Sequence, residues 1–334
     1  MIENLLEYSM NIPQNLRKRI NYQGEFEDML TDVAKSYGIG SFVSFEPMPL
    51  GIEDLNLKLI TTKGKYFVKI FNEKRDDPEC LRLVNIVKIS TDNGVAHPEF
   101  LKRDVGYIFR NQYEQFNIRL AVFEFIEGKT FYELKRNPST SELTEIIRMA
   151  AKVNEIDYKT ADLYDRWATV NFPAEYKKAK KYLTDPEKKM FDDLEKQFEK
   201  INLKSLSHSL VHGDLIGTNI IKGKEKIYFV DFSSANFYPR IVELAVLMSD
   251  IMFDPTGKVS VEKYFDLLVT QYQKYIKLTK EDLEALPLFV KLAHAMNFIG
   301  STLEKEKLKN KSEENEYWLK LSKKGLDATL KVWK

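Results

Sequence analysis

Residues 210–235 read LVHGDLIGTNIIKGKEKIYFVDFSSA, and this stretch decides how the rest of the chain is interpreted. Asp214 is followed by Asn219 five residues later and by Asp231 twelve residues beyond that. Apolar runs flank both acids, so we expect them at strand ends or loop tips and not on a solvated helix face. A carboxylate beside an apolar strand is expensive to desolvate unless a metal or a proton transfer uses it. The stretch therefore indicates a site of chemistry.

The composition limits the classes of protein to which the chain can belong. Its 334 residues, 43% of them apolar, suffice for two domains or one bilobed enzyme with a sizeable core. The 51 basic and 50 acidic residues give a net charge of +1, so we expect no nucleic-acid or membrane partner. The acidic start, MIENLLEYSMNIPQ, does not read as a secretory signal, and no apolar run reaches the length of a membrane span. The single cysteine, Cys80, excludes an intramolecular disulfide, and we expect a cytoplasmic protein.

Residues 40–127 are expected to form a small β-rich lobe, preceded by an amphipathic helix at 25–37. Three short runs, FVSFEPMPL, LNLKLITT and KYFVKIF, predict an antiparallel meander. A helix is expected at 77–90, and strand character returns at 105–109 and 118–125. The pattern predicts a five-stranded sheet with one helix inserted after its third strand.

From Thr130 onward the pattern is mostly helical, which predicts a larger second lobe. The expected helices lie at 139–156, 173–200, 241–252, 260–276, 280–304 and 312–333. The strand–loop–strand unit of residues 210–235 interrupts them. With Gly128 at the boundary, we predict an α+β chain with an N-terminal lobe at 1–127 and a C-terminal lobe at 128–334.

A lysine in the third expected strand supplies a second element of the site. Lys69 alternates with Val68 and Ile70 in YFVKIF, so its side chain leaves the face that theirs share. A lysine on a short central strand is disfavoured unless it is paired, whereas on a sheet edge its head would reach water. Phosphate oxygens together with Glu79, early in the following helix, would pair it. Kinase-type enzymes orient the α- and β-phosphates of ATP in this way.

The residues of the opening stretch suit phosphoryl transfer. Asp214 is placed to accept a proton from an incoming hydroxyl, while Asn219 and Asp231 offer a neutral and a charged oxygen to Mg²⁺. The Asp214–Asn219 spacing equals that of the protein-kinase catalytic loop, and VDF at 230–232 stands where D-F-G stands. LAVFEFIEG at 120–128 suits either a backbone that binds adenine or an ordinary sandwiched strand.

At these residues the chain resembles the aminoglycoside phosphotransferase and choline kinase superfamily, small-molecule kinases with a protein-kinase-like fold. The matching segments are YFVKIF at 66–71, FEFIEGKTF at 123–131, HGDLIGTN at 212–219 and YFVDFSSA at 228–235. The likeness spans about residues 40–255. VDFSSANFYPRIVELAVLMSDIMFD is more similar to the homoserine-kinase and hydroxylysine-kinase branches than to the choline branch.

The resemblance implies a bilobed protein-kinase-like fold whose small antiparallel-sheet lobe binds the nucleotide. Lys69 would hold the ATP phosphates, with Glu79 as its partner. The backbone near Glu124 and Ile126 would hydrogen-bond the adenine. Gly51 opens the nucleotide loop, which has only this one glycine, so the resemblance leaves open whether the loop contacts the phosphates.

In the mainly helical lobe, the resemblance implies the catalytic loop, the metal site and the substrate pocket. Asp214 would be the catalytic base or would orient the hydroxyl, and Asn219 and Asp231 would bind Mg²⁺. His212 would brace the catalytic loop. Glu243 stands where many relatives have an aspartate, and we assign it structural support. Two further departures are Asp54, where relatives often have asparagine, and Ser233, which replaces the glycine of D-F-G.

We expect a monomeric or homodimeric enzyme that uses ATP and Mg²⁺ to phosphorylate a hydroxyl of a small amine-bearing or amino-acid-like metabolite. An amino-acid acceptor would need a basic residue for its carboxylate, for which Arg166 and Arg240 are candidates. An aminoglycoside-type antibiotic would need several acids, and those available are Asp250, Asp254 and Glu304. For each of these residues, an ordinary surface charge is the favoured interpretation.

An alternative from another class is a pseudokinase that binds ATP without turnover. Against it, Lys69, Asp214, Asn219 and Asp231 are all present, whereas a degraded kinase would usually have lost one. A protein kinase would have an arginine directly before the catalytic aspartate and an A-P-E segment after D-F-G, and the chain has neither. A small-molecule acceptor is therefore favoured.

Overall fold

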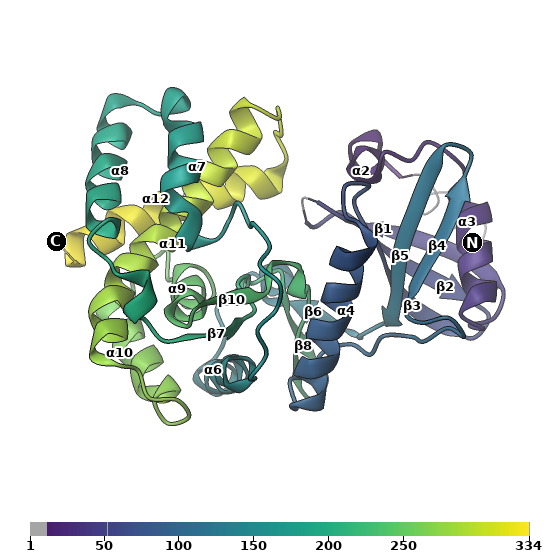
Figure 1. The fold of residues 1–334 in the computed structure, drawn as a ribbon, viewed down its shortest axis with the longest axis horizontal. Coiled ribbons are helices and arrows are strands. Elements are labelled where there is room, and N and C mark those ends of the chain that lie inside the picture. The colour runs from purple at the N-terminus through teal and green to yellow at the C-terminus, as the bar shows by residue number, and fades with distance from the viewer. Residues whose placement is uncertain (1–11, 52, 334) are drawn as a thin grey trace. The chain divides into compact units, whose positions relative to one another are not determined.

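The computed structural model describes residues 12–51 and 53–333, and the chain divides into two compact units. The first unit runs to Lys88 and includes His97–Glu127, while the second comprises Ile89–Ala96 and Gly128–Lys334. Figure 1 colours the first unit purple to blue and most of the second teal to yellow. Each unit has its own layers of secondary structure, and each is described separately.

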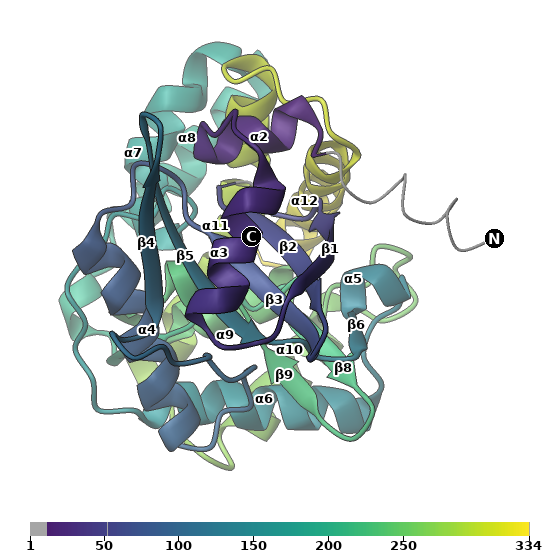
Figure 2. The ribbon, with the colours of Figure 1, turned by 90° about the vertical axis from the view of Figure 1, so that its right-hand side faces the viewer.

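The first unit is built on an antiparallel sheet of five strands in the order β1–β2–β3–β5–β4. The strands are β1 (Phe42–Met48), β2 (Leu55–Thr61), β3 (Gly64–Ile70), β4 (Ile108–Tyr113) and β5 (Phe116–Glu124). The helices are α2 (Gln14–Ile20), α3 (Phe26–Ser36) and α4 (Asp77–Asp92). Figure 2 shows α3 lying across the sheet, and its Leu30 and Val33 share a core with Leu57 and Val68. The predicted sheet, with its helix after the third strand, is confirmed.

Alternation along β3 separates Lys69 from this core. Val68 and Ile70 are fully buried in the core that α3 covers. Lys69, between them, projects from the opposite face, because successive side chains of a strand alternate. Its strand is central in the sheet, with Asn56 of β2 and Ala121 of β5 as its register partners. The alternative interpretation, in which Lys69 lies on a sheet edge with its head in water, is therefore wrong.

The fourth strand differs from its prediction. A strand was expected at 105–109, but β4 begins at Ile108 and continues through the exposed residues 110–112. β4 lies at the sheet edge with β5 as its neighbour, so its outer side chains face water and need not be apolar. A turn with Glu114 at φ 54° joins it to β5. Hydrophobic alternation does not detect a polar edge strand of this kind.

The second unit is mainly helical. Its strands are β6 (Gly128–Thr130), β7 (His208–Val211), β8 (Ile220–Gly223), β9 (Ile227–Phe229) and β10 (Asn236–Pro239). They form two small sheets, β6–β8–β9 and β10–β7. The helices are α5 (Phe131–Leu134), α6 (Thr140–Glu155), α7 (Phe172–Ala179), α8 (Asp185–Phe198), α9 (Ile241–Ser249), α10 (Val261–Tyr272), α11 (Lys280–Glu306) and α12 (Glu313–Val332). The long helix α11 packs against α7, α9 and α12.

The helix expected at 173–200 is interrupted. It consists of α7, a 3-10 turn at Lys180–Tyr182 and then α8. Thr184 and Glu187 form a capping box that starts α8, and Pro186 stands in the first turn, so the local sequence favours a new helix there. Across the described residues, no helix has both the length and the apolar character needed to cross a membrane.

Candidate active site

Asp214 lies in the loop that follows β7, and a glycine allows this loop to turn. Gly213 has a φ of 81°, a region that strains residues with a Cβ. A Cβ at Gly213 would also lie 2.9 Å from the carbonyl oxygen of Ser234. The backbone of the catalytic loop can therefore approach the 3-10 turn Phe232–Ser234 closely.

The structure brings Asp214 and Asn219 together, as their spacing predicts. The Nδ2 group of Asn219 donates to Oδ2 of Asp214 at 2.7 Å and to its backbone carbonyl at 3.0 Å. These bonds use both N–H groups of the amide, which leaves Oδ1 of Asn219 as the atom that can coordinate a cation. A further hydrogen bond joins Asn219 to the segment that precedes Asp231, because the N–H of Val230 donates to the Asn219 carbonyl.

Asp231 adopts a left-handed backbone conformation at the start of the turn. Its φ is 64°, which aspartate tolerates better than most residues do. Its Oδ1 accepts hydrogen bonds from the N–H of Ser233 at 3.3 Å and from the Ser233 hydroxyl at 2.6 Å. Ser233, which stands in place of the glycine of D-F-G, therefore orients the Asp231 carboxylate.

The donor set fits a divalent cation that shares its ligands with phosphates. The amide oxygen of Asn219 and the carboxylate of Asp231 are hard oxygen donors, which Mg²⁺ prefers. Across the residues that the structure describes, no group of three or more His, Cys, Asp or Glu side chains is placed to hold a metal. A cation here would need further ligands, such as phosphate oxygens.

The Asp214 carboxyl lies in a strongly negative setting. Burial raises its pKa to about 8, and the charges of Asp231, Asp165 and Asp250 act in the same direction, while the hydrogen bond from Asn219 opposes them. A carboxyl with a raised pKa is suited to taking up a proton. A cation held beside it would offset the neighbouring charges and favour the ionised form that a base requires.

His212 connects the catalytic loop to the segment that carries Asp231. Its ring is fully buried, with Nε2 3.0 Å from the Val230 carbonyl and Nδ1 3.3 Å from the N–H of Asp214. A carbonyl only accepts and an N–H only donates, so the ring is neutral with its hydrogen on Nε2. The bracing role expected of His212 agrees with this geometry.

Two carboxylates of the α9 region hold the backbone of the catalytic loop. Glu243 accepts the N–H of His212 at 3.2 Å and that of Gly213 at 2.9 Å. Asp250 accepts the N–H of Gly217. Burial raises the pKa of Glu243 to about 7 and that of Asp250 to about 6. These acids fix the loop on both sides of Asp214.

Replacing Glu243 with glutamine is expected to lower kcat and to flatten the pH dependence of stability. The amide keeps one acceptor, so one loop N–H loses its partner, at about 1–3 kcal/mol. The folded-state pKa of about 7 lies above the ordinary value of 4.5, so the free energy of unfolding falls as pH rises between them. The raised pKa of Glu243 thus lowers the free energy of unfolding by about 3 kcal/mol over this pH range, and this change should be absent in the variant.

Urea unfolding at pH 4.5 and pH 7.5, with kcat assays, measures both effects. The control is Glu155→Gln, which makes the same change at an exposed acid of the same unit. If Glu243→Gln follows the wild-type pH profile and keeps the wild-type kcat, Glu243 does not hold the catalytic loop.

In the first unit, Lys69 has an aspartate partner that the motifs do not predict. Its Nζ lies 3.1 Å from Oδ2 of Asp54, and both side chains are about 95% buried. Oδ1 of Asp54 accepts the N–H of Asn72 at 2.9 Å and Nε of Arg75 at 3.2 Å. The aspartate that departs from the family pattern thus orients the lysine.

Replacing Asp54 with alanine is expected to lower the free energy of unfolding by about 3–5 kcal/mol, because Lys69 loses a buried counter-charge. The double variant with Lys69→Met should recover much of this loss. Glu53→Ala is the matched control, since Glu53 pairs with the same Arg75 at 2.8 Å but is half-exposed. We expect less than about 1 kcal/mol from that control. Equal destabilisation by both substitutions in chemical denaturation would contradict the assignment.

The nucleotide-binding roles of Glu79, Gly51, Glu124 and Ile126 stay predictions. The structure shows the surroundings of these residues. Glu79 is half-buried in the first turn of α4. Gly51 has a φ of 98°, which favours glycine there. The N–H of Glu124 donates to the Glu99 carbonyl at 2.9 Å, so only its carbonyl is left for a ligand. Within the described chain, the N–H of Ile126 has no hydrogen-bond partner.

Four of the candidate acceptor residues have structural partners, whereas Nε of Arg240 is buried without a hydrogen-bond partner among the described residues. Arg166, considered for a carboxylate, and Glu304, considered for a cation, form an ion pair with each other at 2.5 Å. Asp254 accepts hydrogen bonds from the hydroxyl and N–H of Thr256 and from the N–H of Val259. Asp250 is occupied by the catalytic loop, as described above. These pairings weaken the case for a site built to bind a polycation.

The surroundings of Asp214 in the second unit also include residues that no motif identifies. Asp165, from the loop after α6, is close enough to raise the pKa of Asp214. The rings of Tyr132, Tyr317 and Trp318 form an aromatic cluster with centroids 5.0–6.4 Å apart. The charge of Asp250 helps burial raise the pKa of Tyr317 to about 12, so this cluster borders the acidic region.

Comparison with known proteins places the chain among kinases. The profile of the Phosphotransferase enzyme family matches residues 44–275. A homoserine kinase of Rhizobium meliloti (strain 1021) is 23% identical, over 79% of this chain and 80% of its own length. An amicoumacin kinase hAmiN complex with AMP-PNP and Ca²⁺ superposes with a TM-score of 0.65 at 16% identity, covering 95% of this chain and 96% of its own. A microcompartment-associated aminopropanol kinase gives 0.65 at 14% identity, with 91% and 96% covered.

Proposed function

Because this chain belongs to the phosphotransferase enzyme family, whose fold and motifs it carries, we propose that it transfers the γ-phosphate of Mg²⁺-bound ATP to the hydroxyl of a small, amine-bearing alcohol. Its class as a small-molecule kinase follows from the family. The metal, the type of acceptor and the roles of individual residues are the proposal. We further propose that the protein works in the cytoplasm, which agrees with its single, buried cysteine. We also propose that it is a monomer or a homodimer.

The observation that carries the proposal is the contact between Asp214 and Asn219, with Asp231 close by. In this arrangement Asp214 accepts the hydroxyl proton of the acceptor as the acceptor oxygen bonds to the γ-phosphorus, and the bond from the γ-phosphorus to the bridging oxygen breaks to release ADP. Asn219 Oδ1 and the Asp231 carboxylate would hold the cation. Bound Mg²⁺ would neutralise charge on the phosphates. Lys69, oriented by Asp54, binds phosphate oxygens in the nucleotide lobe.

The preference for an amine rests on the acids and aromatic rings around Asp214. Asp165 and Asp250 make the region negative, which favours an ammonium group. Tyr317 is 40% exposed, and an exposed aromatic face beside an acid can bind a cation. The acceptor we propose is therefore an alcohol with a primary or quaternary amine, including amino acids with a hydroxyl side chain.

Three related compounds separate the features of the acceptor. Homoserine carries an amine and a carboxylate, 3-aminopropan-1-ol lacks the carboxylate, and 4-hydroxybutanoate lacks the amine. We expect ATP-dependent phosphorylation of at least one amine-bearing compound and a kcat/KM at least about tenfold lower for 4-hydroxybutanoate. Choline, ethanolamine, hydroxylysine and spectinomycin extend the panel, and Asp214→Ala controls for contaminating ATPases.

The same assay decides between the proposal and its alternatives. Turnover of 4-hydroxybutanoate equal to that of the amines would overturn the amine preference. Turnover of spectinomycin alone would favour an antibiotic phosphotransferase. ATP binding without turnover of any acceptor would favour a pseudokinase.

A further inference from the structure

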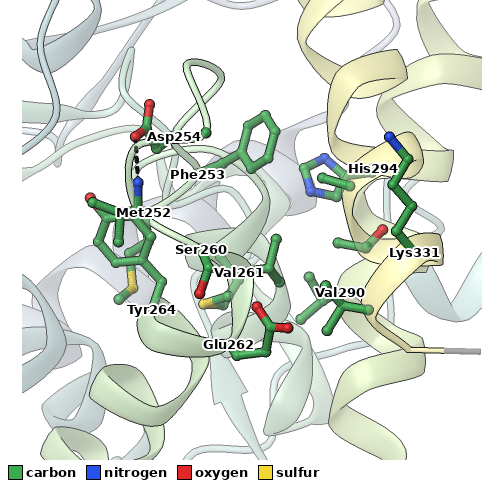
Figure 3. A pocket seen from close by; sticks show the side chains of 16 residues that line it. Met252, Phe253, Asp254, Ser260, Val261, Glu262, Tyr264, Val290, His294 and Lys331 are labelled. Carbon is green, nitrogen blue, oxygen red and sulfur yellow. Dashed lines mark hydrogen bonds between the residues drawn. The ribbon is translucent and has the colours of Figure 1, made fainter.

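The second unit contains a pocket that the proposed reaction does not use. It has a volume of about 220 Å³, and its lining comes from the end of α9, the loop before α10, and helices α10, α11 and α12. Figure 3 shows the labelled side chains around it, with the rings of Phe253 and His294 beside each other. Their centroids are 5.1 Å apart in an edge-to-face arrangement.

His294 is the unusual member of this lining. Its side chain is 1% exposed, and neither Nδ1 nor Nε2 has a hydrogen-bond partner among the described residues. Leaving a buried polar atom without a partner costs about 1–3 kcal/mol. A Cβ at Gly325 would lie 2.0 Å from Cε1 of His294, so a residue without a side chain makes room for the ring. The chain thus accommodates an imidazole whose hydrogen-bonding capacity is unused.

The rest of the pocket lining disfavours a charged ligand. Met248, Met252, Val259, Val261 and Val290 provide apolar walls, and methionine adapts to irregular shapes. The charged residues that line the pocket are Asp254, Glu262 and Lys331. Asp254 is already bound to Thr256 and Val259. Two acids and one lysine disfavour an anion, and burial lowers the pKa of His294 to about 3, so the imidazole is neutral.

We propose that this pocket binds a small neutral molecule with an apolar body and one hydroxyl group, which hydrogen-bonds His294. A neutral imidazole offers one N–H donor and one lone pair, and a hydroxyl can pair with either. The ring nitrogens expose less than 1 Å² each, and the ring edge that carries them lies against Gly325 of α12, so a hydroxyl reaches them only if the surrounding side chains or the ring itself shift. The volume exceeds the 150 Å³ at which an apolar cavity already binds benzene.

The test uses phenol and toluene, which differ by a hydroxyl in place of a methyl group. The full chain is labelled at the methionine methyl carbons, and the NMR signals of Met248 and Met252 report occupancy. We expect both signals to shift, with about tenfold tighter binding of phenol than of toluene, the equivalent of one net hydrogen bond. Asp214→Ala should bind phenol equally, so failure of the proposed reaction leaves this result unchanged.

Two substitutions of similar size isolate the imidazole. His294→Gln keeps a donor and an acceptor and should keep the preference for phenol, whereas His294→Met should lose it. Thermal unfolding checks both variants, and Met is not expected to lower Tm, because it removes two unsatisfied polar atoms. Val261→Trp, at a half-exposed wall position, should block both probes and stands in if a His294 variant fails to fold.

The proposal is overturned if phenol at millimolar concentration leaves Met248 and Met252 unshifted in the wild type. It is also overturned if His294→Met keeps the tenfold preference, or if Val261→Trp binds phenol as the wild type does.

Discussion

Asp214→Ala is expected to lower kcat by about 10²–10⁴-fold, the range that a positioned general base contributes. The Kd for ATP should change by less than about threefold, because groups that act in the transition state affect rate more than binding. Steady-state kinetics with the preferred acceptor gives the first value, and nucleotide titration of the full chain gives the second.

The matched control for this prediction is Asp157→Ala, which removes an exposed acid of the same unit. Its kcat should equal that of the wild type. Asp214→Asn is a useful second variant, since it keeps the size of the side chain while removing its charge. Retention of more than about a tenth of the wild-type kcat in both Asp214 variants would remove this residue from the mechanism.

Asp231→Asn is expected to weaken both nucleotide binding and rate. Asparagine tolerates the left-handed backbone at this position, so the fold of the turn should survive. Losing the only charged metal ligand that we propose should raise the half-saturating Mg²⁺ concentration and the Kd for Mg²⁺-ATP by at least about tenfold, and lower kcat by about 10²-fold.

Titration of Mg²⁺ at fixed ATP separates this effect from a general loss of structure. Asp254→Asn is the control, because it makes the same chemical change in another turn whose backbone N–H groups bind an aspartate. Binding of ATP without divalent metal should be equal in both variants and in the wild type. Unchanged Mg²⁺ dependence in Asp231→Asn would contradict its role as a metal ligand.

Local patterns in the sequence predict much of the fold and the centre of the site. The five-residue offset from Asp214 to Asn219 and the strands on either side of the stretch are short-range properties, and the structure agrees with them. The same holds for the helices, whose apolar faces repeat at helical spacing. Two exceptions are β4, which lies at a sheet edge and carries polar residues, and the helix expected at 173–200, which is divided into α7 and α8.

Pairings between distant residues could not be predicted. Arg166 and Glu304 are 138 positions apart, and nothing in either local sequence indicates the other. Asp54 is a similar case, because its contact with Lys69 depends on the register of β2 and β3. His294 sits within an ordinary helical pattern, so only the packed structure reveals that its ring nitrogens are unsatisfied.

The attachment of the catalytic loop to α9 has a consequence for divergence within the family. Most of α9 is buried, so Glu243 on this helix and Asp250 directly after it belong to a segment with little freedom to change. Helices α7, α8, α10 and α12 supply no hydrogen bond to the backbone of residues 212–217 in the described chain. Substitutions in α7, α8 and α10 can therefore leave the hydrogen bonds of the catalytic loop intact, whereas Trp318 and Leu321 of α12 share a hydrophobic cluster with Ile216 of that loop. This separation of roles suits a fold shared, at 16% and 14% identity, by kinases named for amicoumacin and aminopropanol.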